Sequence, residues 1–202
     1  MPGETITAAR GRRIGLLGGS FNPAHEGHLH ISREALKRLR LDEVWWLVSP
    51  QNPLKPRAGM AELAERVAAA QQVAHGRRIK VTDIESKLGT RYTIDTLRAL
   101  QRRFPGVRFV WLMGADNLAQ IARWRGWRQI FGLLPIAVFD RPAYSLRALS
   151  SQAARRFASQ RIKPEQAFEL AARAAPAWVF IRSRLHPASA TAIRAGKRIK
   201  KG

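Results

Sequence analysis

The sequence predicts an α/β protein with a doubly wound, mainly parallel sheet and a helical C-terminal part. Two observations support this fold class. Short apolar runs alternate with segments of helical periodicity, and the runs are continuously apolar, which is typical of parallel strands buried on both faces. A chain of 202 residues can bury the core of one such domain. We expect this single domain to span 13–202, after a loose leader at 1–12.

Strands are expected where an apolar run ends in turn or loop residues. These runs lie at 14–17, 43–48, 79–81, 107–113, 135–139 and 177–181. Helices are expected where apolar residues recur at intervals of three and four. The first begins close to His28, and the others lie at 61–74, 93–104 and 116–122. The stretch 144–175 is rich in arginine and alanine, has no strand signal and is expected to be helical.

The loop between the first strand and the first helix reads G-G-S-F-N-P-A-H-E-G-H at 18–28. Its glycines let backbone N–H groups approach a ligand, and the positive end of the following helix points back at them. The imidazoles of His25 and His28 converge on the same place. The loop therefore predicts an anion site that suits a phosphate, although neither G-x-G-x-x-G nor G-x-x-x-x-G-K-[ST] is present.

Two other roles for these histidines compete with phosphate binding. A zinc site would need a histidine at position 29 to complete H-E-x-x-H, but Leu29 stands there, and the chain has no cysteine. A purely structural role, in which both rings cap and pack the start of the helix, is the second alternative.

The 18–28 loop resembles the signature of the nucleotidyltransferases with an H-x-G-H motif, whose imidazoles bind the phosphates of a nucleoside triphosphate. A second signature of that superfamily, approximately S-[ST]-T-x-[IV]-R, is similar to S-A-T-A-I-R at 189–194. Ala190 replaces one usual hydroxyl, which puts only that contact in doubt. The resemblance implies catalysis by His25, His28 and Arg194. It implies contacts to ATP from Gly18, Gly19, Ser20, Phe21, His25, His28, Ser189, Thr191 and Arg194.

Within this superfamily the chain resembles the nicotinate-nucleotide adenylyltransferases. A G-x-D motif followed by a tryptophan is present as Asp116 and Trp124, at the end of the 107–113 strand. The resemblance implies that Asp116 binds the nucleoside part of the substrate and that Trp124 stacks on its pyridine ring. Taken alone, Asp116 could equally be a helix N-cap and Trp124 an ordinary core residue.

Three more residues are assigned to the substrate by the same resemblance, and Thr93 is added because it stands at the start of a helix. Lys55 ends a proline-rich loop after the second strand, and Arg141 precedes a proline after the 135–139 strand. Asn22 belongs to the first signature. Thr93 opens a helix, where it could be an N-cap, a substrate ligand or both.

The implied reaction is adenylyl transfer from ATP to nicotinate mononucleotide, which gives nicotinate adenine dinucleotide and pyrophosphate. Mg²⁺ is expected with ATP, bound mainly by substrate oxygens, so no protein metal ligand is assigned. Phosphopantetheine adenylyltransferase, or another H-x-G-H nucleotidyltransferase, is the alternative activity.

The chain is strongly basic, with 36 Lys and Arg against 14 Asp and Glu and a formal net charge of +22. This charge makes a nucleic-acid-binding domain a more remote alternative, but no nucleic-acid module is recognisable. A basic surface also attracts anionic small substrates. The sequence has no apolar run near the ~20 residues that cross a membrane and no signal peptide, so we expect a cytoplasmic protein without membrane contact. It is compatible with a homo-oligomer.

Overall fold

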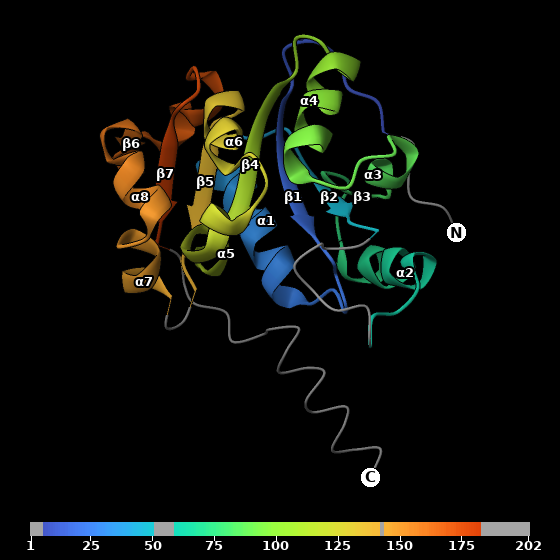
Figure 1. The fold of residues 1–202 in the computed structure, drawn as a ribbon. Coiled ribbons are helices and arrows are strands. Elements are labelled where there is room, and N and C mark those ends of the chain that lie inside the picture. The colour runs from blue at the N-terminus through green and yellow to red at the C-terminus, as the bar shows by residue number, and fades with distance from the viewer. Residues whose placement is uncertain (1–5, 51–58, 142–143, 183–202) are drawn as a thin grey trace.

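A computed structural model describes residues 6–50, 59–141 and 144–182 of the chain. These residues form a seven-stranded sheet with helices on both faces (Figure 1). The strands are β1 (Arg13–Gly19), β2 (Glu43–Val48), β3 (Ile79–Thr82), β4 (Arg108–Gly114), β5 (Ile136–Phe139), β6 (Arg161–Ile162) and β7 (Trp178–Ile181). The α-helices are α1 (Glu26–Arg38), α2 (Leu63–Val73), α3 (Ile84–Lys87), α4 (Thr93–Arg103), α5 (Ala115–Gln120), α6 (Trp127–Leu133), α7 (Ser145–Leu149) and α8 (Gln152–Arg156). Short 3-10 helices occupy Ile121–Arg123, Ala158–Gln160 and Pro164–Ala172.

The strand order is β3-β2-β1-β4-β5-β7-β6, and every strand pair is parallel. The order reverses between β1 and β4, which is the kind of switch point at which doubly wound folds bind ligands. The arrowheads of β1 and β5 point to the same lower edge in Figure 1, which is the carboxyl edge of the sheet. The predicted doubly wound, parallel fold is therefore confirmed.

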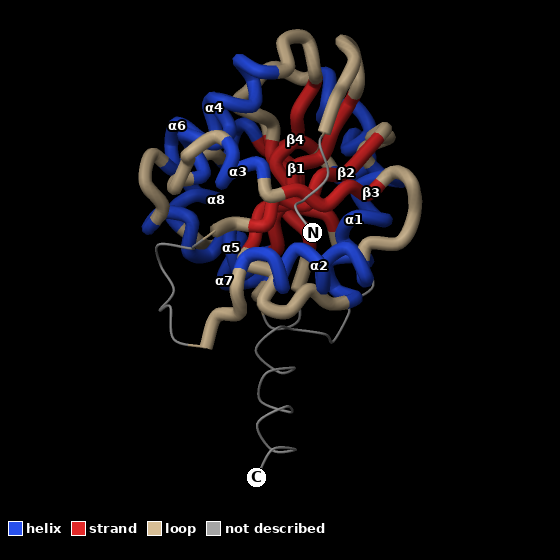
Figure 2. Tube along the Cα trace, turned by 90° about the vertical axis from the view of Figure 1, so that its right-hand side faces the viewer, coloured by secondary structure: helices blue, strands red, loops and turns tan. Residues whose placement is uncertain are grey.

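Two apolar layers enclose the sheet. One layer joins side chains of β1, β2, β4, β5 and β7 to those of α3, α4, α5, α6 and α8. The other joins the opposite faces of the same strands to α1, α2 and the 3-10 helix Pro164–Ala172. In Figure 2 the sheet separates α4 and α6 from α1. Burial of both faces explains why the strands are continuously apolar instead of alternating.

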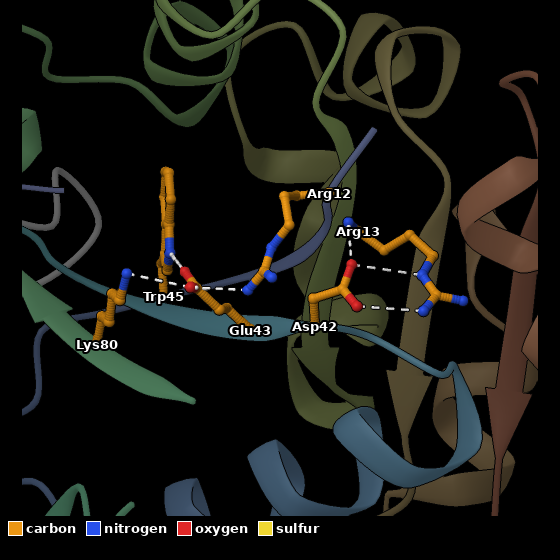
Figure 3. A network of polar contacts seen from close by, with 6 residues as sticks. All are labelled: Arg12, Arg13, Asp42, Glu43, Trp45 and Lys80. Atoms are coloured by element: carbon orange, nitrogen blue, oxygen red, sulfur yellow. Dashed lines mark hydrogen bonds and ion pairs between the residues drawn. The ribbon is translucent and has the colours of Figure 1, made fainter. Parts of the chain in front are cut away.

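A network of ion pairs lies at the opposite, amino edge of the sheet, where β1 and β2 begin (Figure 3). Glu43 accepts from Arg12 at 3.0 Å, pairs with Lys80 at 3.1 Å and accepts from the Trp45 indole at 2.9 Å. Asp42 pairs with the Arg13 guanidinium at 3.2 Å and accepts from the Arg13 N–H at 2.8 Å. Each carboxylate therefore has more than one donor.

Three features depart from the sequence-based expectation. The stretch 144–175 contains the short strand β6, which pairs with β7 through Arg161 and Ile162. The helix α6 was not predicted, because it follows a 3-10 turn that breaks the apolar periodicity. The described part of the expected leader contacts the domain: Ile6 is buried in the core, and the Gly11 N–H donates to Gly106 O at 2.8 Å. Among the described residues, no helix is long and apolar enough to cross a membrane.

Candidate active site

The two loops beside the strand-order reversal carry the predicted site residues. The 18–28 loop leaves β1, and the Gly114–Asp116 turn leaves the adjacent β4. Both therefore lie at the carboxyl edge, beside the strand-order reversal at which doubly wound folds bind ligands. The structure brings the front signature and the G-x-D motif together, although about 90 residues of sequence separate them.

The two histidines cap helix α1 through each other's backbone. His25 is the N-cap, and its Nδ1 accepts from the Gly27 N–H at 3.1 Å. His28 reaches back, and its Nδ1 accepts from the His25 N–H at 3.2 Å. This is a capping box built from imidazoles instead of a hydroxyl and a carboxylate. The capping role weighed from the sequence is therefore confirmed.

The same hydrogen bonds also determine which nitrogen of each ring carries the proton. An Nδ1 that accepts a hydrogen bond carries no proton, so each neutral ring bears its proton on Nε2. The ring centroids of His25 and His28 lie 3.9 Å apart, so the two imidazoles are in contact. Capping and anion binding are therefore compatible, because they use different nitrogens.

Aromatic side chains pack against the imidazole pair. The Phe21 ring lies 4.7 Å from the His28 ring and stacks on Trp46 at 5.1 Å, centroid to centroid. The Trp46 indole N–H donates to Ser32 Oγ at 2.7 Å, and Ser32 Oγ donates to the His28 carbonyl at 2.8 Å. Trp46 on β2 thus ties the first turns of α1 to the sheet, which holds the rings in place.

The backbone of the 18–28 loop approaches its neighbours closely at Gly18. A Cβ at this position would overlap the Trp111 ring, with Cζ2 only 3.2 Å away and Cη2 closer still. Phe21 has φ of +46°, a left-handed conformation that an aromatic residue rarely adopts. At Gly19 a Cβ would meet only the Phe21 ring, at 3.4 Å. Steric packing therefore requires glycine at position 18 and not at position 19.

Asp116 and Arg141 form a pair across the ends of β4 and β5. Arg141 Nε lies 3.4 Å from Asp116 Oδ1, a buried oxygen with no hydrogen-bond partner among the described residues. The cap of helix α5 is Gly114, and no side chain caps it, so the alternative of Asp116 as an N-cap is wrong. A Cβ on Gly114 would overlap both partners, so this glycine makes the pair possible.

Thr93 is the first residue of α4, and the cap position belongs to Tyr92, which makes no side-chain capping bond. The alternative of Thr93 as the N-cap is therefore wrong. A helix end without a side-chain cap keeps N–H donors for an anion. Trp124 ends the 3-10 turn after α5 and is half-buried against the core, which leaves part of its ring accessible.

A buried arginine beneath the 18–28 loop was missed by the sequence analysis. Arg66 on α2 is 3% exposed, and it donates to the carbonyls of Ser20, Ser49, Pro50 and Ala61 at 2.7–3.0 Å. Burial lowers the pKa of Arg66, and the nearby Glu62 opposes this shift. The sequence pattern could have indicated that Arg66 is buried, since this residue occupies the apolar stripe of α2 together with Val67 and Ala70.

Asn22 and Glu85 hold neighbouring segments of the same edge. The Asn22 amide donates to Gly59 O at 3.0 Å and accepts from the Ala61 N–H at 3.4 Å. Glu85 on α3 is buried, and its carboxyl has hydrogen bonds with the side chains of Ser49 and Thr96. Burial raises the pKa of Glu85 to about 7, against the effect of these hydrogen bonds. No sequence signal distinguished Glu85 from other helix carboxylates.

Four predicted residues lie outside the part of the chain that the structure describes. They are Lys55, Ser189, Thr191 and Arg194. The remaining predicted residues all belong to segments at the carboxyl edge or directly after it.

Comparison with known proteins identifies the family of the chain. Residues 16–196 match the model of the family described as "Cytidylyltransferase-like". A protein of Cereibacter sphaeroides (strain ATCC 17023) named "Probable nicotinate-nucleotide adenylyltransferase" is 56% identical over 182 residues, which cover 90% of this chain and 96% of that protein. A protein of the same name from Methylorubrum extorquens (strain PA1) is also 56% identical, with coverage of 90% and 98%.

The fold is also that of solved enzymes of distant sequence. The Plasmodium falciparum nicotinic acid mononucleotide adenylyltransferase complexed with NaAD superposes with a TM-score of 0.68 at 17% identity, over 94% of this chain and 89% of that chain. Its complex with APC gives 0.67 at 15% identity, over 91% and 83%. With its sheet order, its histidine pair and relatives of more than half identical sequence, the chain belongs to the nicotinate-nucleotide adenylyltransferases, within the cytidylyltransferase-like family.

Proposed function

We propose that this protein transfers the adenylyl group of ATP to nicotinate mononucleotide, in NAD biosynthesis. The observation that carries the nucleotidyl-transfer chemistry is the imidazole pair of His25 and His28, whose rings lie 3.9 Å apart, centroid to centroid, at the N-terminus of α1. The identity of the acceptor is supported by membership of the family, since relatives 56% identical carry that name.

In this reaction a phosphate oxygen of nicotinate mononucleotide attacks the α-phosphorus of ATP. The new P–O bond forms as the bond between the α-phosphorus and the bridging oxygen to the β-phosphate breaks, and pyrophosphate leaves with the electron pair. The attacking oxygen is ionised at neutral pH, so the protein needs no general base. Its task is to position two polyanions and to stabilise the charge that develops on the phosphoryl groups.

His25, His28 and the backbone of the 18–21 loop suit this task, because neutral N–H donors and the α1 N-terminus stabilise negative charge. The resemblance of 189–194 to the rear signature supports Arg194, Ser189 and Thr191 as further phosphate ligands, with Arg194 on the charge of the transition state. These residues complete the proposed ATP site of one domain over 13–202.

The acceptor site is proposed on the neighbouring loops. The unsatisfied Oδ1 of Asp116 suits a hydroxyl donor of the nucleoside part, and Arg141 beside it suits the acceptor phosphate. Trp124 is proposed to stack on the pyridine ring, and the uncapped start of α4 at Thr93 to bind its carboxylate. Asn22 and Lys55 complete this set.

Magnesium enters as the complex with ATP, and its charge offsets that of the phosphates. The described residues contain no group of three or more His, Asp or Glu that could hold a metal ion. The proposed ligands of the ion are oxygens of the substrates, because Mg²⁺ prefers oxygen ligands and the phosphates supply them.

The test is pyrophosphate release from Mg·ATP with nicotinate mononucleotide, nicotinamide mononucleotide and phosphopantetheine offered in parallel. The proposal predicts the highest kcat/KM with the nicotinate nucleotide. Turnover with phosphopantetheine alone would contradict the acceptor and favour the alternative enzyme. A salt-sensitive nucleic-acid gel shift without any pyrophosphate release would contradict the enzymatic function.

A further inference from the structure

Arg66 is a charged side chain in the protein interior, where a charge without a neutralising partner costs free energy. It is 3% exposed and belongs to the buried residues of α2, together with Val67 and Ala70. Each hydrogen bond that it donates ends on a backbone carbonyl: Nη1 to Ser20 O and to Ser49 O, both at 2.7 Å, Nη2 to Pro50 O at 3.0 Å and Nε to Ala61 O at 2.8 Å.

Carbonyl groups satisfy the donors of the guanidinium but do not neutralise it, because they carry no net charge. The salt bridges within the described residues include none to Arg66, although Glu62 lies close enough to stabilise its charged form. Burial lowers the pKa of Arg66, in keeping with a cation held away from water. A net positive charge therefore lies beneath the 18–21 loop.

The bond to Ser20 O also orients the loop. A trans peptide unit points its C=O and its N–H in opposite directions. Since the Ser20 carbonyl is directed at Arg66, the N–H of Phe21 in the same peptide plane is directed away from α2. Phe21 follows with φ of +46°, so the chain turns sharply at this N–H. Such a turn presents backbone donors to an anion.

The same Nη1 group joins the ends of two strands. It bridges Ser20 after β1 and Ser49 after β2, and the Ser49 N–H donates to Gly19 O at 2.9 Å. One guanidinium thus fixes the relative position of the two loops at this side of the carboxyl edge. The fork of the guanidinium adds Pro50 O through Nη2 and Ala61 O through Nε, and a single ammonium with three donors could not hold all four carbonyls at once.

We propose that Arg66 is a positioning residue of the phosphate-binding loop. It holds the Ser20–Phe21 peptide with its N–H directed to the ligand, and its buried charge favours an anion above the loop. This inference rests on the proposed function only for the identity of the anion, a nucleoside triphosphate. It concerns binding, so it can be tested without catalysis.

The test compares Arg66→Met and Arg66→Lys with Val67→Ala on the same helix turn, which removes buried apolar contacts and touches no loop carbonyl. The probe is inorganic tripolyphosphate, measured by calorimetric titration, together with the free energy of unfolding of each variant. We expect Arg66→Met to raise the Kd about tenfold or more and Arg66→Lys to give an intermediate value, because the lysine keeps the charge and loses the fork. Val67→Ala should leave the Kd within about twofold.

Wild-type affinity in Arg66→Met would overturn the inference, as would an equal loss of affinity in Val67→Ala, or a wild-type protein that does not bind tripolyphosphate. If Arg66→Met does not fold, Arg66→Lys decides the matter: an unchanged Kd contradicts the inference and a raised Kd supports it. If tripolyphosphate binding depends on Arg66 but the protein does not transfer an adenylyl group, the proposed function is overturned. The inference about Arg66 is still supported by that result.

Discussion

Charged side chains have different partners at the two edges of the sheet. At the amino edge, Asp42 and Glu43 each pair with basic side chains at 3.0–3.2 Å (Figure 3). At the carboxyl edge, Arg66 is bonded to neutral carbonyls, and Arg141 lies 3.4 Å from an aspartate oxygen that has no hydrogen bond within the described part of the chain. Each carboxylate of the first edge has several donors, whereas the second edge carries the groups that we propose to bind the substrates.

We expect this difference to separate residues that only stabilise the fold from residues of the proposed site. Partly exposed ion pairs contribute little to stability, in the range of about 0–1 kcal/mol each. Strained backbone and buried, unneutralised charge cost free energy, and they persist where function requires them. Substitutions at the carboxyl edge should therefore affect catalysis strongly, and those at the amino edge should affect stability weakly.

The largest effect is expected for His25→Ala and His28→Ala. Each removes one Nε2–H donor from the proposed phosphate site, and losing a preorganised donor of this kind lowers kcat by about 10²–10³. Each also removes half of the capping box, which costs about 1 kcal/mol of folding free energy. Steady-state pyrophosphate release and urea unfolding measure the two effects separately. Turnover near the wild-type rate in both variants would remove the histidines from the mechanism.

Gly18→Ala should destabilise the protein by about 1–3 kcal/mol, because the new methyl group overlaps the Trp111 ring in a packed interior. The matched variant is Gly19→Ala, whose methyl group would make only an ordinary contact with Phe21. Thermal unfolding of the pair checks this difference. Equal losses of stability would mean that the close approach at Gly18 does not limit packing.

The buried carboxyl of Glu85 should make stability depend on pH. Its folded pKa is about 7 and its ordinary value is 4.5, so between these two values the folded state binds more protons than the unfolded state. Stability then falls as pH rises from 4.5 to 7. A shift of this size corresponds to roughly 3 kcal/mol.

Glu85→Gln removes this titration and keeps polar atoms for Ser49 and Thr96. Urea unfolding of both proteins from pH 5 to 8 isolates the contribution of this one group, since all other titrations are shared. We expect the wild-type protein to lose more stability than the variant over this range. Parallel pH profiles would contradict the assignment.

The smallest effect is expected at the amino edge. Burial alone would raise the pKa of Asp42, but the hydrogen bonds from Arg13 and the charges of Arg13 and Arg12 lower it on balance. The resulting stabilisation is present above the ordinary pKa and is lost as pH falls through the lowered one. Asp42→Asn should therefore cost at most about 1 kcal/mol near pH 7 and leave pyrophosphate release unchanged. A clear loss of turnover would contradict the division between the two edges.

The sequence predicted the sheet well, because continuous apolar runs such as 43–48 and 107–113 fit only strands with two buried faces. It also predicted that glycines, a helix start and paired histidines share one loop, and the structure has them together at the start of α1. It failed where a role depends on tertiary contacts. Arg66 and Glu85 appear as ordinary helix residues until the strand ends pack over them, and the caps at Tyr92 and Gly114 depend on where each helix begins.

The most direct test keeps the cap of α1 and removes the imidazoles. In His25→Asn and His28→Gln, the side-chain amide oxygen can still accept the Gly27 or His25 N–H, while no ring Nε2 remains. If the histidines bind the triphosphate, both variants should have near wild-type stability and pyrophosphate release lowered about 100-fold or more. Stable variants with undiminished turnover would show that the histidines only cap the helix.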